Sequence, residues 1–353
     1  MLSKQEKARY QKQTILPEIG IEGQEKLSAA KVLVIGAGGL GCPVLLYLAA
    51  AGIGTLGIAD GDVVDISNLQ RQVLYTVEEI GQKKAAVAEK KLKSLNPHIT
   101  VNLYPVFINS DNALEIMRDY DIVVDGSDNF STRYLINDAC TILNKPMVSG
   151  AIYKFEGQVS VFNYHNGPTY RCIFPEPPQD GESPNCADIG VVASLPGIIG
   201  AIQANEVIKM VTGIGEVLSG RLLVIDTLTM NSHTFNFKLN PANKTIHTLK
   251  DNPKYCKSPV TEISYGDLLQ KTMHNATQLV DVRETAENLA GNIGGINIPL
   301  STFETAYNIL DPSATVILYC ASGVRSKRAA ELLVSKGFID VLTLEKGINA
   351  VII

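Results

Sequence analysis

The chain has 353 residues, of which 45% are hydrophobic and 19% charged, and its formal net charge is −5. This composition is typical of globular domains and excludes a disordered or fibrous protein. The acidic balance gives no support for a nucleic-acid partner, and six cysteines are too few for a disulfide scaffold. At roughly 150 residues per domain, the length predicts two domains.

The first residues, MLSKQEKARYQKQ, are polar and contain no apolar core of a secretion signal. The stretch 32–59 carries no charge, which raises the question of a membrane span. Glycines interrupt it after four apolar residues, so a strand, a turn, a helix and a second strand explain it better. We therefore expect a cytoplasmic protein with reduced thiols and no membrane association.

The first two thirds of the chain predict a doubly wound α/β sheet, preceded by a helical arm in residues 1–30. Strands are expected at 31–35, 55–59, 100–107, 121–125, 145–153, 157–163, 221–226 and 234–239. Helices are expected at 43–51, 81–95, 131–143 and 194–211. Such alternation of apolar strands with helices is typical of a doubly wound sheet.

A smaller α/β unit is expected after a polar, turn-rich segment. Residues 175–189 are rich in proline and predict an exposed, mobile loop within the first domain. In the last third, strands are expected at 279–282, 315–319 and 341–344, with a helix at 325–337. We assign residues 1–245 to the first domain, 246–259 to a linker and 260–353 to the second domain.

A glycine-rich turn follows the first predicted strand and matches G-x-G-x-x-G at Gly36, Gly38, Gly39 and Gly41. Glycine permits a tight turn and close approach of the backbone to a phosphate, and the helix N-terminus favours negative charge. Asp60 ends the next predicted strand, where a carboxylate can accept hydrogen bonds from ribose hydroxyls. The pattern predicts a nucleotide site. The alternative is that the glycines only permit helix–sheet packing.

The polar residues that come next favour ATP over NAD, because a triphosphate needs several cations and amide donors. They are Asp62, Asn68, Arg71, Gln72 and Lys84. Asp128 and Asn129 follow the predicted strand 121–125, where a carboxylate beside phosphates can hold Mg²⁺. Taken singly, the arginine and the lysine could equally be solvated surface charges.

The segments GAGGLG, SNLQRQ, GQKK and GSDNFSTR occur in this order, and residues 5–245 resemble the ThiF/MoeB/HesA adenylyltransferases. The resemblance implies a Rossmann-like fold that binds ATP and the C-terminal Gly-Gly tail of a ubiquitin-like sulfur-carrier protein. AMP is transferred to the tail carboxylate and pyrophosphate is released. Because this carboxylate is already an anion, no general base is needed, and catalysis rests on positioning and charge stabilisation.

The resemblance also assigns residues to the nucleotide. It places Gly39, Asp60, Asn68, Arg71, Lys84, Asp128 and Asn129 at the ATP and Mg²⁺ positions. It further implies a homodimer in which a basic residue of the N-terminal arm reaches the partner's nucleotide. That position is Lys12 here, where relatives commonly have Arg, and Arg9 is a second candidate.

Many members of the family bind a structural zinc ion with two C-x-x-C pairs, and both pairs are incomplete here. The first reads Thr169-Tyr170-Arg171-Cys172, and only Cys256 is left of the second. Since a tetrahedral zinc site needs four ligands, we expect no structural zinc. Cys172 and Cys256 are then leftover or structural thiols. The alternative, a two-cysteine site completed by His or Asp, has no supporting spacing. Cys42 and Cys140 fall on predicted helices and are expected to be buried.

Two other cysteines are placed for chemistry. Cys186 lies in the proline-rich loop, and the resemblance puts it at the crossover-loop cysteine that takes part in sulfur handover. The alternative is an unreactive exposed thiol. Cys320 ends the predicted strand 315–319 and precedes a helix, so backbone N–H groups can stabilise a thiolate or persulfide. Arg325 adds a cation.

Residues 261–353 resemble a rhodanese domain through LVDVRE, GNIGGINIPL, YCASGVRS and LEKGINA. This implies that Cys320 carries a persulfide sulfur taken from a persulfide or thiosulfate donor. The segment GNIGGINIPL departs from the family's GHIPGA pattern, because the His and Pro of that pattern are replaced by Asn292 and Gly294, and the family's final aromatic residue is also absent. The whole chain is thus predicted to convert the carrier tail into a thiocarboxylate for molybdopterin, thiamine or thio-modified tRNA synthesis.

Three other functions stay open at this point. A carrier-docking or regulatory protein with weakened catalysis is suggested by the incomplete zinc pairs and by lysine at position 12. An NAD-dependent oxidoreductase is suggested by the glycine motif alone. A ubiquitin-type conjugating enzyme would form a thioester on Cys186 without sulfur transfer.

Overall fold

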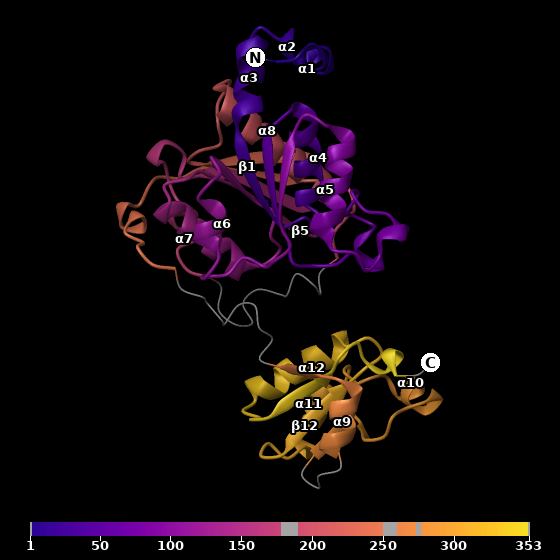
Figure 1. The fold of residues 1–353 in the computed structure, drawn as a ribbon. Helices are drawn as coiled ribbons and strands as arrows, with labels where there is room; N and C mark the ends of the chain where they lie inside the picture. Colours follow the sequence, from indigo (N-terminus) through magenta and orange to yellow (C-terminus); the bar gives the residue numbers. More distant parts are fainter. Residues whose placement is uncertain (1, 178–189, 250–259, 273–276, 352–353) are drawn as a thin grey trace. The chain divides into compact units, whose positions relative to one another are not determined.

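A computed structural model describes residues 2–177, 190–249, 260–272 and 277–351. The chain divides into two compact units, residues 1–254 and 255–353, which we call unit 1 and unit 2 (Figure 1). The division lies within the predicted linker, 246–259.

Unit 1 contains an eight-stranded mixed sheet with the order β3-β2-β1-β4-β5-β6-β7-β8. The five strands β1 to β5 run parallel, and β6, β7 and β8 extend the sheet in antiparallel fashion. The strands are β1 (Lys31–Ile35), β2 (Thr55–Ala59), β3 (Thr100–Tyr104), β4 (Ile122–Asp125), β5 (Met147–Tyr153), β6 (Glu156–Phe162), β7 (Arg221–Asp226) and β8 (Asn231–Asn236).

Helices cover both faces of this sheet, as predicted for a doubly wound fold (Figure 1). One face carries α4 (Gly41–Ala51), α5 (Lys84–Leu95) and α8 (Leu195–Thr212), and the other carries α6 (Ala113–Met117) and α7 (Phe130–Ile142). The predicted N-terminal arm forms α1 (Lys4–Arg9), α2 (Gln11–Thr14) and α3 (Gly20–Ala29).

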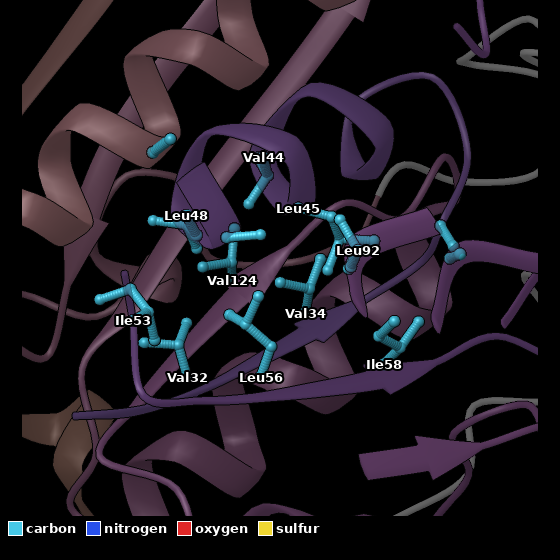
Figure 2. Close-up of a cluster of buried hydrophobic side chains, with 14 of the residues drawn as sticks. Val32, Val34, Val44, Leu45, Leu48, Ile53, Leu56, Ile58, Leu92 and Val124 are labelled. Atoms are coloured by element: carbon cyan, nitrogen blue, oxygen red, sulfur yellow. The ribbon is translucent and has the colours of Figure 1, made fainter. Parts of the chain in front are cut away.

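The core of unit 1 follows from the alternation of side chains along each strand. Val32 and Val34 of β1 point toward α4 and pack with Leu45 and Leu48, whereas Leu33 lies in the cluster on the α7 side (Figure 2). All five are fully buried. Because β1 is covered on both faces, it reads as a continuous apolar run rather than an alternating one.

Unit 2 contains a five-stranded parallel sheet with the order β11-β10-β12-β13-β9. Its strands are β9 (Thr261–Ile263), β10 (Thr277–Asp281), β11 (Ile296–Asn297), β12 (Thr315–Tyr319) and β13 (Val341–Leu344). Its helices are α9 (Tyr265–Thr272), α10 (Thr285–Ala290), α11 (Phe303–Ala306) and α12 (Val324–Ser335).

The predicted bounds are confirmed residue for residue for β1, β2, β7, β12 and β13. The bounds predicted for the last strand, 234–239, are wrong, since β8 occupies Asn231–Asn236. Its register is set by the hairpin with β7, in which Asn231 lies opposite Asp226. The helix predicted from residue 81 begins at Lys84. Within the described residues, no helix is long and apolar enough to cross a membrane.

Candidate active sites

Close packing fixes the glycine-rich turn between β1 and α4. Gly36 has a φ of 91°, and a Cβ there would lie 2.7 Å from the carbonyl oxygen of Gly126. A Cβ on Gly41 would lie 1.9 Å from the carbonyl oxygen of Gly36. The two glycines are therefore required by the fold itself, and they bring the turn against the loop that follows β4.

Asp60 at the end of β2 supports the same turn. Its carboxylate accepts the N–H of Ala37 at 2.7 Å and the N–H of Asp62 at 2.8 Å. Burial raises the pKa of Asp60, and these two hydrogen bonds oppose the effect. The hydroxyl of Tyr75 donates to the carbonyl of Ala37 at 2.7 Å. Tyr75 was not predicted, because an aromatic residue in an apolar stretch carries no functional signal of its own.

The segment from Asp62 to Lys84 returns to the turn. Lys84 Nζ pairs with Asp62 Oδ2 at 3.1 Å, although the lysine is only 5% exposed. The carbonyl of Asn68 accepts the N–H groups of Arg71 and Gln72. A Cβ on Gly39 would lie 3.8 Å from Arg71 Cγ, and a Cβ on Gly38 would lie 3.6 Å from Gln72 Nε2. The buried Gln72 Oε1 has no hydrogen-bond partner among the described residues.

A buried ion pair holds the loop after β4. Asp125 Oδ2 accepts Arg133 Nε at 3.1 Å, and both residues are buried. Arg133 Nη2 also donates to the carbonyl of Ser127 at 3.1 Å. The next residue, Asp128, is exposed, and Asn129 Oδ1 accepts the N–H of Thr132 as the N-cap of α7. The loop thus presents a carboxylate at the carboxyl end of β4, beside the glycine turn.

The structure therefore brings together nearly all of the predicted nucleotide residues at the carboxyl ends of β1, β2 and β4. Lys12 does not join them within one chain. Its neighbour Gln13 donates to the carbonyl of Ala51, the last residue of α4. Since α4 begins at the glycine turn and has 11 residues, its ends lie about 16 Å apart. Arg9 contacts the carbonyl of Leu95 at the end of α5.

In unit 2, the predicted cysteine lies at the carboxyl end of β12. Cys320 is fully buried, and its Sγ accepts the N–H of Gly323 at 3.1 Å. Ser326 Oγ lies 3.6 Å from the same sulfur. Gly323 has a φ of 92° and is the N-cap of α12. The loop therefore aims backbone and hydroxyl donors at the sulfur, and this arrangement stabilises negative charge there.

Arg325 follows this loop in α12, and its guanidinium forms an ion pair with Glu287. Its two terminal nitrogens donate to Glu287 Oε2 at 2.6 Å and to Glu287 Oε1 at 2.7 Å. The pair lowers the pKa of Glu287 to about 2. The pKa of Arg325 is raised chiefly by Glu287, with a smaller electrostatic contribution from Cys320. Glu287 was not predicted, because nothing in the sequence links residue 287 to residue 325.

The remaining described cysteines are distributed as follows. Cys42 and Cys140 are buried, as predicted, and burial raises the pKa of Cys42 to about 12. Cys172 accepts hydrogen bonds from Thr169 N, Asn240 N and Asn243 Nδ2 at 3.3–3.5 Å. Burial would raise the pKa of Cys172, but the hydrogen bonds with the Thr169 hydroxyl and with these three groups outweigh it and lower the pKa.

Two predicted thiols, Cys186 and Cys256, lie outside the described residues, as does most of the loop predicted at 175–189. Within the part of the chain that the structure describes, no group of three or more His, Cys, Asp or Glu side chains could hold a metal ion.

Comparisons with known proteins match both units. Residues 10–248 match the ThiF family, and residues 264–352 match the rhodanese-like domain. The probable adenylyltransferase/sulfurtransferase MoeZ of Mycobacterium tuberculosis is 42% identical over 99% of this chain and 93% of its own length. The adenylyltransferase and sulfurtransferase MOCS3 of Drosophila yakuba is 41% identical over 92% of this chain and 78% of its own.

Other relatives match unit 1. The sulfur carrier protein adenylyltransferase of Thermus thermophilus is 52% identical over 68% of this chain and 90% of its own length. Among solved structures, PaaA is 26% identical, with a TM-score of 0.58 over 67% of this chain and 76% of its own. MccB of E. coli with ATP is 23% identical, with a TM-score of 0.60 over 68% of this chain and 74% of its own. The MccB likeness shows the fold alone.

Proposed function

This chain belongs to the ThiF family and carries a rhodanese-like domain, and we propose that it activates the C-terminal Gly-Gly carboxylate of a ubiquitin-like sulfur carrier and then sulfurates it. Relatives that match nearly the whole chain are adenylyltransferases and sulfurtransferases, and the chain is an enzyme of this class. The observation that carries the proposal is the presence of two separate sites at the carboxyl ends of parallel strands. One suits a nucleotide and the other a persulfide.

The first step is adenylation in unit 1. We assign the phosphates of ATP to the glycine turn, with Arg71 and Lys84 as cations and Gln72 as an amide donor. The space beside Gly38 supports this assignment, because a Cβ there would approach only the side chain of Gln72. The buried Gln72 Oε1 without a partner also fits a site that a ligand completes. The ribose is assigned to Asp60, whose carboxylate is fixed by two backbone N–H groups.

Asp128 is proposed to hold Mg²⁺ together with the phosphates, with Asn129 beside it. Magnesium commonly takes only one or two protein carboxylates and completes its shell with water and phosphate oxygens. The exposed carboxylate of Asp128, on a loop fixed by Asp125 and Arg133, fits this donor set. When bound, the ion would neutralise charge on the phosphates. The chain's own contribution is to place the tail carboxylate in line with the α-phosphate.

The second step is sulfur transfer in unit 2. Cys320 is proposed to receive sulfur from a persulfide or thiosulfate donor. The N–H of Gly323 and the hydroxyl of Ser326 stabilise the resulting anion. The terminal sulfur then attacks the acyl-adenylate and AMP leaves, which joins the tail to Cys320 as an acyl disulfide. A second thiol attacks the sulfur of Cys320, the S–S bond breaks, and the electron pair leaves with the thiocarboxylate. The disulfide left on Cys320 is then reduced by an external thiol. We propose that Cys186 takes part in the handover, by displacing AMP or by relaying the sulfur.

The assembly and pathway are also proposals. We propose a homodimer in which Lys12 serves the partner's nucleotide. Its place near the far end of α4 supports this, because it is remote from the glycine turn of its own chain. The thiocarboxylate product would serve molybdopterin, thiamine or thio-modified tRNA synthesis.

The adenylation proposal is tested by pyrophosphate release. The full chain is mixed with ATP, Mg²⁺ and a panel of purified carrier proteins that end in Gly-Gly. We expect release that requires both ATP and one of the carriers. A carrier whose last glycine is deleted is the matched control and should give no release. Absence of release with every carrier would contradict the proposal and favour a docking or regulatory role.

A further inference from the structure

The loop that follows Cys320 offers no side-chain cation of its own. Ala321, Ser322, Gly323 and Val324 are uncharged, and the first basic residue is Arg325. The side chains of Arg325 and its partner Glu287 are 33% and 40% exposed, so the pair lies at the surface of unit 2. The guanidinium nearest in sequence to Cys320 is therefore part of an ion pair without net charge.

The carboxylate of Glu287 is held in place from two sides. Besides the two hydrogen bonds from Arg325, its Oε2 accepts the N–H of Glu284 at 3.1 Å in the capping box of α10. Ser301 Oγ in turn donates to Glu284 Oε2 at 3.1 Å. The next basic residue of α12, Lys327, is paired with Glu262 at 2.9 Å. Both of the first two cations of α12 are thus matched by carboxylates.

This charge balance bears on which sulfur donor Cys320 accepts. With thiosulfate, the Cys320 thiolate attacks the outer sulfur, the S–S bond breaks, and the electron pair leaves with sulfite. With an alkyl persulfide RSSH, the thiolate attacks the terminal sulfur and the electron pair leaves with RS⁻. The thiolate and thiosulfate together bring three negative charges to the loop. The thiolate and a neutral persulfide bring one, and the thiolate and an ionised persulfide bring two. Because the guanidinium of Arg325 is paired with Glu287, it stabilises this added negative charge less than a free guanidinium would, and the reaction with thiosulfate is disfavoured.

We propose that Glu287 is a specificity-determining residue: by holding Arg325, it makes Cys320 take sulfur from alkyl persulfides in preference to thiosulfate. This inference rests on the proposed sulfurtransferase function and names its donor class. Glu287 acts through Arg325 and touches no reacting atom, so it is a positioning residue and not a catalytic one.

The test compares donors in the full chain. Sulfur loading is measured by mass spectrometry of the peptide that carries Cys320, with thiosulfate and with free cysteine persulfide as donors. Glu287→Gln keeps the hydrogen bond to Glu284 but removes the charge. We expect it to raise the rate constant with thiosulfate about tenfold and to change that with cysteine persulfide less than about twofold. Glu262→Gln, which frees Lys327 instead, is the matched control and should leave the ratio unchanged.

If Glu287 has a purely structural role, Glu287→Gln should change the rate constants with both donors by the same factor, and that result overturns the proposal. Glu287→Asp keeps the negative charge and should preserve the native preference, so a variant that merely perturbs packing is recognised. If Glu287→Gln leaves the donor ratio unchanged while both donors load sulfur, the role of Glu287 is contradicted and the sulfurtransferase function stands. If neither donor loads sulfur onto the native chain, the sulfurtransferase function itself is contradicted, and this proposal with it.

Discussion

The two units place reactive groups in the same topological position but surround them differently. In unit 1, the exposed carboxylate of Asp128 and the buried, unpartnered Gln72 Oε1 lie around a turn that presents backbone N–H groups. In unit 2, the sulfur of Cys320 already accepts hydrogen bonds, and Arg325 is paired with Glu287. In the proposed function, Asp128 and Gln72 of unit 1 are completed by a large ligand, although Lys84 is already paired with Asp62. Unit 2 instead surrounds the one sulfur that is proposed to react.

The difference follows from the chemistry proposed for each unit. A triphosphate brings several charges, so its site needs groups that are left for the ligand to satisfy. A thiol that carries one sulfur atom needs a fixed local environment, and the tight turn before α12 supplies it. If this comparison is correct, each half of the reaction can be removed without the other.

The largest separable effect is expected for Cys320→Ala. Sulfur loading in unit 2 should be lost completely, since the attacking atom is gone, while pyrophosphate release should stay at the native rate. Loading is measured by mass spectrometry and pyrophosphate by a coupled assay on the same preparation. Cys172→Ala is the control and should retain both activities. Loading that persists at the native level in Cys320→Ala would contradict the assignment of this thiol.

The converse effect is expected for Asp128→Ala. Pyrophosphate release should fall on the order of a hundredfold or more, because the metal and phosphates lose their carboxylate ligand. Sulfur loading on Cys320 should be unchanged. Asp119→Ala removes an exposed carboxylate just before β4 instead of just after it, and this variant should keep full activity. Full activity of Asp128→Ala would overturn the Mg²⁺ assignment.

A purely structural effect, without a direct loss of either activity, is expected for Arg133→Gln. It leaves the buried Asp125 carboxylate without its charge partner, which typically costs about 3–5 kcal/mol. Hydrogen exchange should then accelerate in β4 and β5 but not in β12, because the two units are separate compact bodies. Arg133→Lys keeps the charge and should exchange more slowly than Arg133→Gln. Equal acceleration in both units would show that they do not unfold independently.

The smallest effect concerns the pH dependence of unit 2. Because Arg325 lowers the pKa of Glu287 from 4.5 to about 2, the pair stabilises the folded state above pH 4.5. This contribution to stability is lost as the pH falls from 4.5 to about 2. Thermal unfolding between these pH values should be less pH-dependent in Glu287→Gln than in the native chain. The difference should be small, because the pair is partly exposed. Identical pH profiles would contradict this role.

The sequence predicted the elements best where strands are buried on both faces. β1 and β12 are apolar runs bounded by polar or glycine residues, and both were located residue for residue. β8 was misplaced because all of its residues are exposed and its register depends on the hairpin with β7. β11 was not predicted, since two residues form no pattern.

The site residues divide in a similar way. Those that belong to contiguous motifs, such as Gly36 or Lys84, were named from the sequence and lie together in the structure. Those that act across the fold were not. Tyr75 reaches Ala37 over 38 positions, and Glu287 reaches Arg325 over the same separation. Such contacts cannot be predicted from local sequence patterns, because they depend on how distant segments are arranged in the fold.

One chain is proposed to perform both adenylation and sulfuration, each at its own site. The most direct test is the mass of the carrier's C-terminus after incubation with the full chain, ATP, Mg²⁺, a sulfur donor and a thiol reductant. We predict replacement of one carboxylate oxygen by sulfur with the native chain, an AMP adduct with Cys320→Ala, and an unmodified tail with Asp128→Ala. A thiocarboxylate formed by either variant at the native level would show that Cys320 and Asp128 do not have these roles.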